Sequence, residues 1–390
     1  MNKIGQSLIL LLSFLIQFSF AQDQQDFEHT MNSKVFEKER KVKVFLPKRY
    51  LRDSISKFAV TYVLDAQHQI FWDIIRGNSS YMIDNYSVIP MIIVGIVSDN
   101  RGSEFNPKND KLRQHIKDEV FPLIEKEYRV DNFRAIVGHS WGGAFVGNTI
   151  FSEHRDMFNA YIGISPSFGD KENIIEKHAD SLLKNKVSFK KFLYFSYGDV
   201  GRREVEFAGY VNNIDSLLKL NQNKTIAWQP RHIKDVGHWQ IVGPSFCDGL
   251  LSMSRNYFAD QKHIEDFIKA KNGNIKEYIS NFNSSSLENF EYVHKASANY
   301  YNFVANDLKA QKNYEKAIEV YKIALEISPD NLRIYRSLAD SYDQLKDVKM
   351  AKQTFTKIKS LLEEQKDSLS AKYYKDMIEW SNEMLTGYEN

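Results

Sequence analysis

The chain has 390 residues, more than one hydrophobic core usually serves, so we expect one large domain and a smaller one. With 43% hydrophobic and 26% charged residues, the composition is that of a globular protein and excludes a disordered or fibrous one. The formal net charge of +2 lacks the basic excess of nucleic-acid-binding proteins, so no nucleic-acid partner is expected.

The first 21 residues have the pattern of a secretory signal peptide. A lysine precedes an apolar run over residues 8–20, and the small residues Ser19 and Ala21 stand where signal peptidase reads the chain. The run is interrupted by polar residues and is short for a bilayer span of about 20 residues, which favours cleavage over a retained anchor. We therefore expect residues 1–21 to be removed, no membrane span to remain, and the mature protein to be periplasmic or secreted.

Further along, apolar runs of strand character alternate with segments of helical periodicity. The expected strands are residues 41–47, 58–64, 91–97, 134–137, 160–164, 192–197 and 225–233. The expected helices include residues 113–128, 174–183 and 211–220. Because such alternation builds βαβ units, residues 22–260 are predicted to form an α/β domain with a mostly parallel central sheet.

A second, all-α domain is predicted after Phe258, where strand patterns stop. The first copy of a 34-residue repeat contains Tyr301, Ala305, Leu308, Ala317, Tyr321, Ala324 and Pro329, and the second contains Tyr335, Ala339, Tyr342, Ala351, Phe355 and Ile358. This is the spacing of tetratricopeptide repeats. We expect a helical linker over 261–297, repeats over 298–390 and a capping helix over 371–385. Packing is favoured as the role of the repeats, and binding of a protein partner is the alternative.

The segment Gly138-His139-Ser140-Trp141-Gly142 lies between a predicted strand and a predicted helix. In this Gly-x-Ser-x-Gly pattern, glycines allow a sharp turn that exposes the serine above the sheet, which suits a nucleophile. A glycine-rich turn without chemistry can have the same sequence. The assignment of Ser140 as nucleophile therefore depends on finding a base and an acid further along the chain.

A histidine and two acids follow Ser140 in the order of α/β-hydrolases. His238 lies in a glycine-containing loop after the last predicted strand, which makes it the best placed of the ten histidines to act as the base. Asp199 and Glu204 both follow the strand predicted over 192–197. Asp199 is favoured slightly as the acid, and Glu204 is the alternative.

Two backbone amides are needed to stabilise the oxyanion that forms when a serine attacks an ester. The first is expected to be the N–H of Trp141, directly after the nucleophile. The second should come from the loop after the strand predicted over 58–64, where Ala66 and Gln67 are the candidates.

Several short segments lie around this Ser-His-acid pattern: Leu46-Pro47, Tyr62-Val63-Leu64-Asp65, Val94-Gly95-Ile96, Asn100-Arg101, Asn106-Pro107, Gly138–Gly143, and His238 with Pro244-Ser245 and Asp248-Gly249-Leu250. Together they resemble the Putative esterase family, which includes esterase D-like enzymes, feruloyl esterases, mycolyltransferases and ferri-siderophore (enterochelin) esterases. The resemblance covers roughly residues 30–260 and is strongest for the siderophore-esterase branch. Ala66 departs from the glycine usual in the family.

The resemblance implies an α/β-hydrolase fold and an esterase that needs no metal or cofactor. Arg101 matches a family arginine near the pocket mouth, where it would contact an anionic or catecholate acyl group; an ion pair with Asp99 or Glu104 is slightly favoured over this role. We expect an exported serine esterase acting on a small-molecule ester, such as a siderophore or an aromatic acyl ester. The alternative is an interaction protein whose repeats bind a partner, with an inactive or acyltransferase hydrolase domain.

Overall fold

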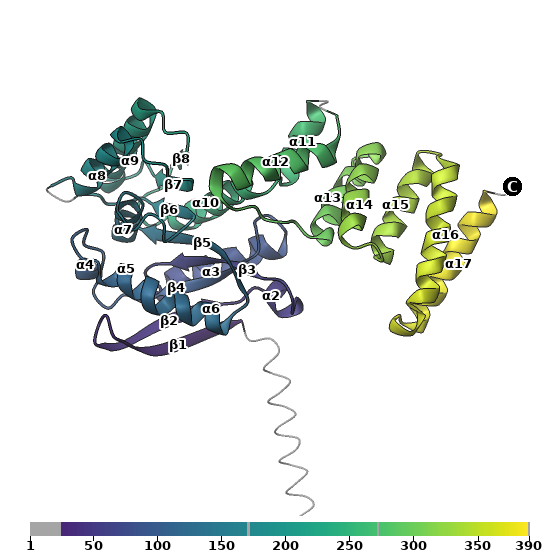
Figure 1. The fold of residues 1–390 in the computed structure, drawn as a ribbon, viewed down its shortest axis with the longest axis horizontal. Helices are drawn as coiled ribbons and strands as arrows, with labels where there is room; N and C mark the ends of the chain where they lie inside the picture. The colour runs from purple at the N-terminus through teal and green to yellow at the C-terminus, as the bar shows by residue number, and fades with distance from the viewer. Residues whose placement is uncertain (1–24, 170–171, 271–272, 389–390) are drawn as a thin grey trace, which may run out of the picture. The chain divides into compact units, whose positions relative to one another are not determined.

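The computed structural model describes residues 25–169, 172–270 and 273–388 (Figure 1). The predicted signal peptide lies outside these described residues. Within them, no helix has the length and apolar character needed to cross a membrane. The chain divides into two compact units: one extends to Asn256 and includes Asn289–Tyr292, and the other comprises Tyr257–Glu288 and the chain from Val293 onward.

The first unit contains an eight-stranded sheet with the order β1-β2-β4-β3-β5-β6-β7-β8 (Figure 1). The strands are β1 (Asp26–Ser33), β2 (Lys38–Phe45), β3 (Phe58–Val63), β4 (Met91–Ile96), β5 (Val130–His139), β6 (Ala160–Ile164), β7 (Lys191–Tyr197) and β8 (Ile226–His232). β2 is antiparallel to both of its neighbours, β1 and β4, and the remaining pairs are parallel. The predicted mostly parallel α/β sheet is confirmed.

Helices on both faces cover this sheet. They are α2 (Lys48–Arg52), α3 (Gln69–Asp84), α4 (Arg101–Glu104), α5 (Lys111–His115), α6 (Phe121–Glu127), α7 (Trp141–Ile150), α8 (Ile174–Lys184), α9 (Arg202–Asn221) and α10 (Val242–Tyr257). The single helix predicted over 113–128 is instead interrupted by a π-helical turn, η1 (Ile116–Val120). Pro122, which has no N–H to donate, lies in the first turn of α6 directly after this irregularity.

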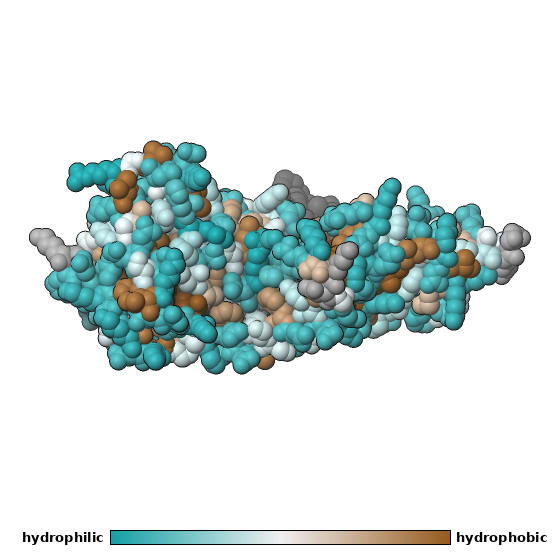
Figure 2. Space-filling model, turned by 90° about the horizontal axis from the view of Figure 1, so that it is seen from above, coloured by the Kyte–Doolittle hydropathy of each residue, from teal (hydrophilic) through white to brown (hydrophobic). Residues whose placement is uncertain are grey.

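The core of the first unit lies between the sheet and its helices. Every residue of β3 and β4 is buried, as expected for strands covered on both faces. Burial of the apolar side chains of these strands stabilises the folded state by about 25 cal/mol for each Å² of apolar surface removed from water. The surface seen in Figure 2 is mainly hydrophilic, with apolar side chains in small patches.

The described residues of the second unit form helices joined by loops, and no strand occurs among them. Its helices are α11 (Gln261–Lys269), α12 (Ile275–Phe290), α13 (Ala298–Ala310), α14 (Tyr314–Ile327), α15 (Leu332–Gln344), α16 (Val348–Glu364), the short 3-10 turn η2 (Lys366–Ser368) and α17 (Ala371–Gly387). The repeat alanines Ala305 and Ala339 are fully buried, so small side chains lie where the helices pack. At the end of the unit, Trp380 of α17 packs edge-on against Phe355, with ring centroids 4.9 Å apart.

A short segment at the end of α12 belongs to the first unit. The ring of Tyr292 packs against Phe133 with centroids 4.5 Å apart, and its hydroxyl donates a hydrogen bond of 2.9 Å to Asp131. The residue that follows, Val293, is again part of the second unit. The chain therefore returns once to the first unit after leaving it.

Candidate active site

Ser140 occupies the turn between β5 and α7 with φ 59° and ψ −117°. A positive φ is uncommon for a serine and costs about 1 to 3 kcal/mol, so the surrounding structure must enforce it. The turn is so tight that a Cβ on Gly138 would lie 2.2 Å from the carbonyl oxygen of Gly142. The local geometry is the strand–turn–helix that presents a nucleophilic serine in α/β-hydrolases.

The last residue of β6 and the segment that follows it hold the backbone of Ser140 from both sides. The Ser140 N–H donates to the carbonyl oxygen of Ile164 at 2.9 Å, and the Ser167 N–H donates to the carbonyl oxygen of Ser140 at 3.1 Å. These two bonds fix the peptide groups on either side of the serine, so its side chain has a defined direction.

His238 is buried, and its Nδ1 lies 2.8 Å from Oε1 of Glu204. Because a carboxylate accepts at Nδ1, the imidazole carries its proton there and leaves Nε2 free to accept one. The ring of His139, next to Ser140 in the chain, packs against the ring of His238 with centroids 4.5 Å apart, and its Nε2 lies 2.8 Å from the carbonyl oxygen of His238. These contacts bring the loop that carries His238 to the Ser140 turn.

Glu204 is fully buried in the first turn of α9, where the helix dipole favours a carboxylate. The helix begins after Gly201, whose φ of 90° suits glycine and turns the chain so that Glu204 points inward. Burial acts to raise the pKa of Glu204, but hydrogen bonds from His238, Ser165 and the Gly198 N–H outweigh it, so the pKa is lowered overall. Glu204 is therefore ionised at neutral pH and suited to orient His238.

The slight preference for Asp199 over Glu204 is not supported by this geometry. Asp199 is partly exposed, and its carboxylate lies 2.9 Å from Nε2 of His232 and accepts the Asp235 N–H at 2.8 Å. The N–H groups of Asp199 and Val200 both donate to the carbonyl oxygen of Val236 at 3.1 Å. Asp199 thus joins the loop after β7 to the loop that carries His238 and does not contact the imidazole.

Of the two amides proposed after β3, only one is available to a substrate. The Ala66 N–H donates to the carbonyl oxygen of Ile96 at 3.1 Å, which removes it as an oxyanion donor. Within the described residues, the N–H groups of Gln67 and Trp141 have no protein acceptor. The Gln67 side chain fixes its own loop, since it donates to Asp65 and accepts the Ser98 N–H, both at 2.9 Å. Gln67 and Trp141 are the remaining pair.

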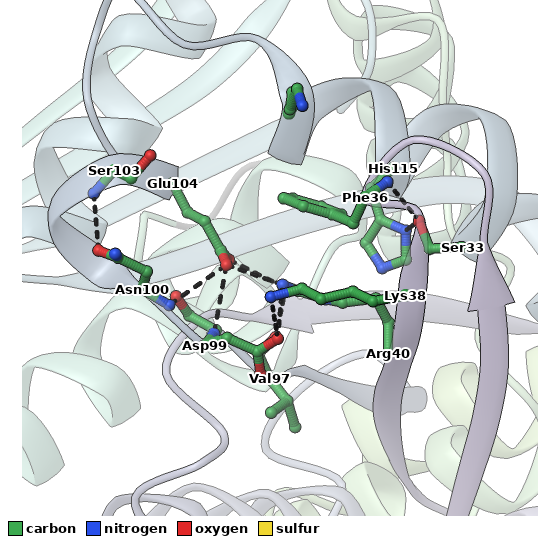
Figure 3. Close-up of polar contacts among 12 residues, drawn as sticks. Ser33, Phe36, Lys38, Arg40, Val97, Asp99, Asn100, Ser103, Glu104 and His115 are labelled. Carbon is green, nitrogen blue, oxygen red and sulfur yellow. Dashed lines mark hydrogen bonds and ion pairs between the residues drawn. The ribbon is translucent and has the colours of Figure 1, made fainter.

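Arg101 forms an ion pair that was not expected. Its Nε and Nη2 atoms lie 2.5 and 2.8 Å from the two oxygens of Asp65, whose side chain is 4% exposed. The favoured partners, Asp99 and Glu104, bind Arg40 instead (Figure 3). The expected ion pair of Arg101 with Asp99 or Glu104 was therefore wrong. Arg40 of β2 binds these two acids, and Arg101 binds Asp65, which follows β3. Arg101 secures the loop that carries Gln67.

The Arg40 guanidinium holds α4 in place through Glu104, the last residue of this helix. It is fully buried and donates to both oxygens of Glu104, at 2.7 and 2.9 Å, and to the carbonyl oxygen of Val97 at 2.7 Å. Figure 3 shows the Glu104 carboxylate between Arg40 and the backbone of Asp99 and Asn100. This bidentate pair fixes the helix on which Arg101 lies.

A pocket of about 220 Å³ lies beside the Ser140 turn. Its lining includes Trp141 and Ala144 of α7 and is largely apolar and aromatic, with Phe105, Phe168 and Ile175. Arg101 is the charged residue of this lining, and Asp65 neutralises it. The pocket has the size and character to hold a small planar or apolar acyl group.

One group of possible metal ligands occurs among residues 25–169, 172–270 and 273–388. Ligand atoms of Asp110, Glu153 and His154 lie within 4.8 Å of one another, but two of the three residues are exposed acids. Asp110 is already paired with Arg113. None of these residues lines the pocket beside Ser140.

Sequence reasoning missed two residues that contact the proposed machinery, Asp65 as the partner of Arg101 and Ser165. The Ser165 hydroxyl donates to Glu204 at 2.5 Å and lies 3.0 Å from Nδ1 of His238. Ser165 directly follows the strand predicted over 160–164. The rule that functional groups gather at the carboxyl ends of parallel strands would have pointed to it.

The parallel sheet, the serine turn after β5, and the histidine and buried acid after later strands place the protein in the α/β-hydrolase class. The model of the family described as Putative esterase matches residues 33–233, which is more than half of the chain. The chain belongs to this family, as its sequence segments predicted, and is a carboxylic ester hydrolase. A TPR repeat model matches residues 305–346, which confirms the tetratricopeptide character of this stretch.

Solved structures share the fold. An IroE-like serine hydrolase from Shewanella oneidensis is 17% identical with a TM-score of 0.63, covering 77% of this chain and 99% of its own. An uncharacterised protein from Capnocytophaga ochracea is 14% identical with a TM-score of 0.62, covering 86% and 94%. Siderophore hydrolase EstB from Aspergillus nidulans is 17% identical with a TM-score of 0.51, covering 59% and 95%. No curated protein matches the chain.

Proposed function

We propose that the protein is a serine esterase in which Ser140 is the nucleophile, His238 the general base and Glu204 the acid that orients it. The observation that carries this proposal is the buried hydrogen bond from His238 Nδ1 to Glu204 beside the strained Ser140 turn. It leaves Nε2 of His238 as the atom that takes the Ser140 proton while Oγ attacks the ester carbonyl carbon.

The attack creates a tetrahedral oxyanion, for which the N–H groups of Trp141 and Gln67 are the proposed donors. Protonated His238 then gives its proton to the departing alcohol, and an acyl group remains on Ser140. In the second half of the reaction, His238 takes a proton from water, the hydroxide attacks the acyl carbonyl, and the acid leaves as Ser140 recovers its proton. Every proton passes through His238, so no metal or cofactor is needed.

The proposed substrate class is either a siderophore ester or a carboxylic ester with an aromatic acyl group. Support comes from the aromatic lining of the pocket beside Trp141 and from two similar structures that are described as an IroE-like serine hydrolase and a siderophore hydrolase. Hydrolysis rates on a catecholate lactone, a feruloyl sugar and a simple acetyl ester test this choice. A preference for the acetyl ester would contradict it.

The substitution Ser140→Ala tests the mechanism. With p-nitrophenyl acetate as substrate, kcat should fall by about a thousandfold or more, while the melting temperature stays close to that of the unmodified protein. Labelling by a fluorophosphonate probe should occur at Ser140 and should be absent from the variant. Full activity of the variant would rule out Ser140 as the nucleophile.

A protein partner of the repeats is proposed as a second property, supported by the TPR match over residues 305–346. The alternative that the hydrolase unit is an inactive scaffold for such a partner predicts no fluorophosphonate labelling. Transfer of the acyl group to an acceptor other than water uses the same residues, and product analysis in the presence of alcohols distinguishes it from hydrolysis.

Export to the periplasm or the medium is also proposed, from the sequence pattern of residues 1–21. Mass spectrometry of the protein recovered from its producing cell should find Gln22 as the first residue. A mature chain that retains residues 1–21 would contradict cleavage.

A further inference from the structure

The Ser165 hydroxyl lies at the junction of the two groups that form the acid–base pair. Its Oγ is 2.5 Å from Oε1 of Glu204 and 3.0 Å from Nδ1 of His238, and the residue is fully buried. A carboxylate can only accept, so the hydroxyl proton points to Glu204. The lone pairs of the Ser165 oxygen are then free to face the Nδ1–H of His238.

The Nδ1–H of His238 therefore has two acceptors, the Glu204 carboxylate at 2.8 Å and the Ser165 oxygen at 3.0 Å. Glu204 in turn receives three donors, since its other oxygen accepts the Gly198 N–H at 2.6 Å. With every side of the carboxylate occupied, neither Glu204 nor the imidazole can rotate without breaking a buried hydrogen bond.

The backbone of Ser165 is held in an unusual conformation with φ 45°. Its N–H donates to the carbonyl oxygen of Ser196 on the adjacent strand at 2.9 Å. Ile164, directly before Ser165, and Ser167, two positions after it, hold the two peptide groups of Ser140. One four-residue segment after β6 thus contacts the nucleophile through its backbone and the acid–base pair through its side chain.

We propose that Ser165 is a positioning residue of the hydrolytic reaction, whose hydroxyl keeps the His238 proton on Nδ1 and holds Glu204 in register with Ser140. This inference rests on the proposed function. When His238 becomes an imidazolium during the reaction, the Ser165 oxygen stabilises its Nδ1–H together with Glu204. The contribution is to the chemical step, because the Ser165 hydroxyl contacts the acid–base pair and Ser165 is not among the residues that line the pocket beside Ser140.

Two substitutions separate the hydroxyl from the backbone. Both Ser165→Ala and Ser165→Gly remove the hydroxyl, but glycine adopts φ 45° without strain whereas alanine does not. If the hydroxyl is responsible, kcat on p-nitrophenyl acetate should fall about tenfold to a hundredfold in both variants, with KM changed less than about threefold. If only the backbone conformation matters, Ser165→Gly will keep the kcat of the unmodified protein, which would overturn the proposal.

A spectroscopic readout distinguishes positioning from a general loss of stability. The low-field proton resonance of the His238 Nδ1–H should shift in both Ser165 variants. The matched control is Ser196→Ala, which removes another fully buried serine hydroxyl that has no hydrogen bond to Glu204 or His238 among the described residues. This control should retain kcat and the resonance position. An unchanged resonance in folded Ser165→Gly would also overturn the proposal.

The Ser140→Ala variant separates failure of this inference from failure of the proposed function. If Ser140→Ala hydrolyses the ester normally, the proposed function is wrong and the inference falls with it. If Ser140→Ala is inactive and both Ser165 variants keep full kcat, the proposed function stands and the role of Ser165 alone is refuted.

Discussion

The Oε1 atom of Glu204 lies 2.8 Å from Nδ1 of His238, and both side chains are buried. Replacing Glu204 by Gln should lower kcat by about a hundredfold to ten-thousandfold, because an amide cannot neutralise the imidazolium and can present its NH₂ to the ring. The matched variant Asp199→Asn should lose less than about tenfold, since Asp199 only joins two loops. Steady-state kinetics on a chromogenic ester measure both effects. An equal or greater loss in Asp199→Asn would reverse the assignment of the acid.

The ion pair between Arg101 and Asp65 makes a prediction about the oxyanion loop. In Arg101→Met, the nearly buried Asp65 carboxylate loses its bidentate partner, which should lower the free energy of unfolding by about 3 kcal/mol. The Gln67 N–H should also shift, so kcat should fall more than KM rises. Urea denaturation and kinetics report the two effects.

The double variant Asp65→Asn/Arg101→Met is the control for this pair. It removes the uncompensated carboxylate, and it should recover part of the stability lost in Arg101→Met. The cycle also needs the loss of unfolding free energy in Asp65→Asn alone. If the double variant is less stable than Arg101→Met by that same amount, the two residues are not coupled and the interpretation is wrong.

The buried pair between Arg40 and Glu104 should dominate the stability of the α4 region. Glu104→Ala leaves a fully buried guanidinium without its bidentate partner and should lower the free energy of unfolding by about 3 to 5 kcal/mol. Lys38→Ala removes the neighbouring pair with Asp99, in which both side chains are about half exposed, and should cost less than about 1 kcal/mol. Chemical denaturation measures both losses of unfolding free energy. Similar losses in Glu104→Ala and Lys38→Ala would contradict the prediction that the buried ion pair contributes more than the exposed one.

Burial of His139 predicts a loss of stability in mild acid. Desolvation lowers the pKa of His139 from 6.5 to about 3, so the unfolded chain binds a proton in this interval that the folded protein does not. The contribution of neutral His139 to the free energy of unfolding is complete above pH 6.5, the pKa of His139 in the unfolded chain. This contribution is lost as the pH falls towards about 3.

The substitution His139→Gln tests the pH effect, because glutamine can donate a hydrogen bond but does not titrate. Between about pH 5.5 and 4, the slope of unfolding free energy against pH should be smaller in the variant by up to about 1.4 kcal/mol per unit. Burial also lowers the pKa of His115, so part of the slope should persist. Identical slopes for the two proteins would show that His139 does not titrate in this range.

The sequence predicted the features that depend on local pattern. Strands β2 to β8, the Ser140 turn and the position of His238 follow from apolar runs, glycines and chain order, each of which acts over a few residues. The edge strand β1 (Asp26–Ser33) was not predicted. The partners of Asp199, Ala66 and Arg101 depend on elements distant in the chain. Ala66 loses its N–H to Ile96 on a neighbouring strand, and Arg101 turns to Asp65 because Arg40 already occupies Glu104.

The choice between Asp199 and Glu204 as the acid also depends on contacts that the sequence does not show. Asp199 and Glu204 are five positions apart, and either could reach His238 in an extended chain. Gly201 precedes α9 and sets the direction in which the helix begins, so that Glu204 points towards the core. The direction of the helix depends on its packing against the sheet, which cannot be predicted from a local sequence pattern. Ser165 was missed for a related reason. Its importance comes from Glu204 and His238, which follow it by 39 and 73 positions and lie after other strands of the sheet.

The return of residues 289–292 to the first unit has a consequence for biosynthesis. Phe133 and Asp131 have their contacts with Tyr292 only after α11 and all of α12 have left the ribosome. A gene shortened at codon 256 would leave an apolar ring of the hydrolase unit without its cover. The helical unit therefore begins as an insertion within the hydrolase chain and not as a simple addition to its end, so a chain cut at that codon loses the Tyr292 contacts of the hydrolase unit.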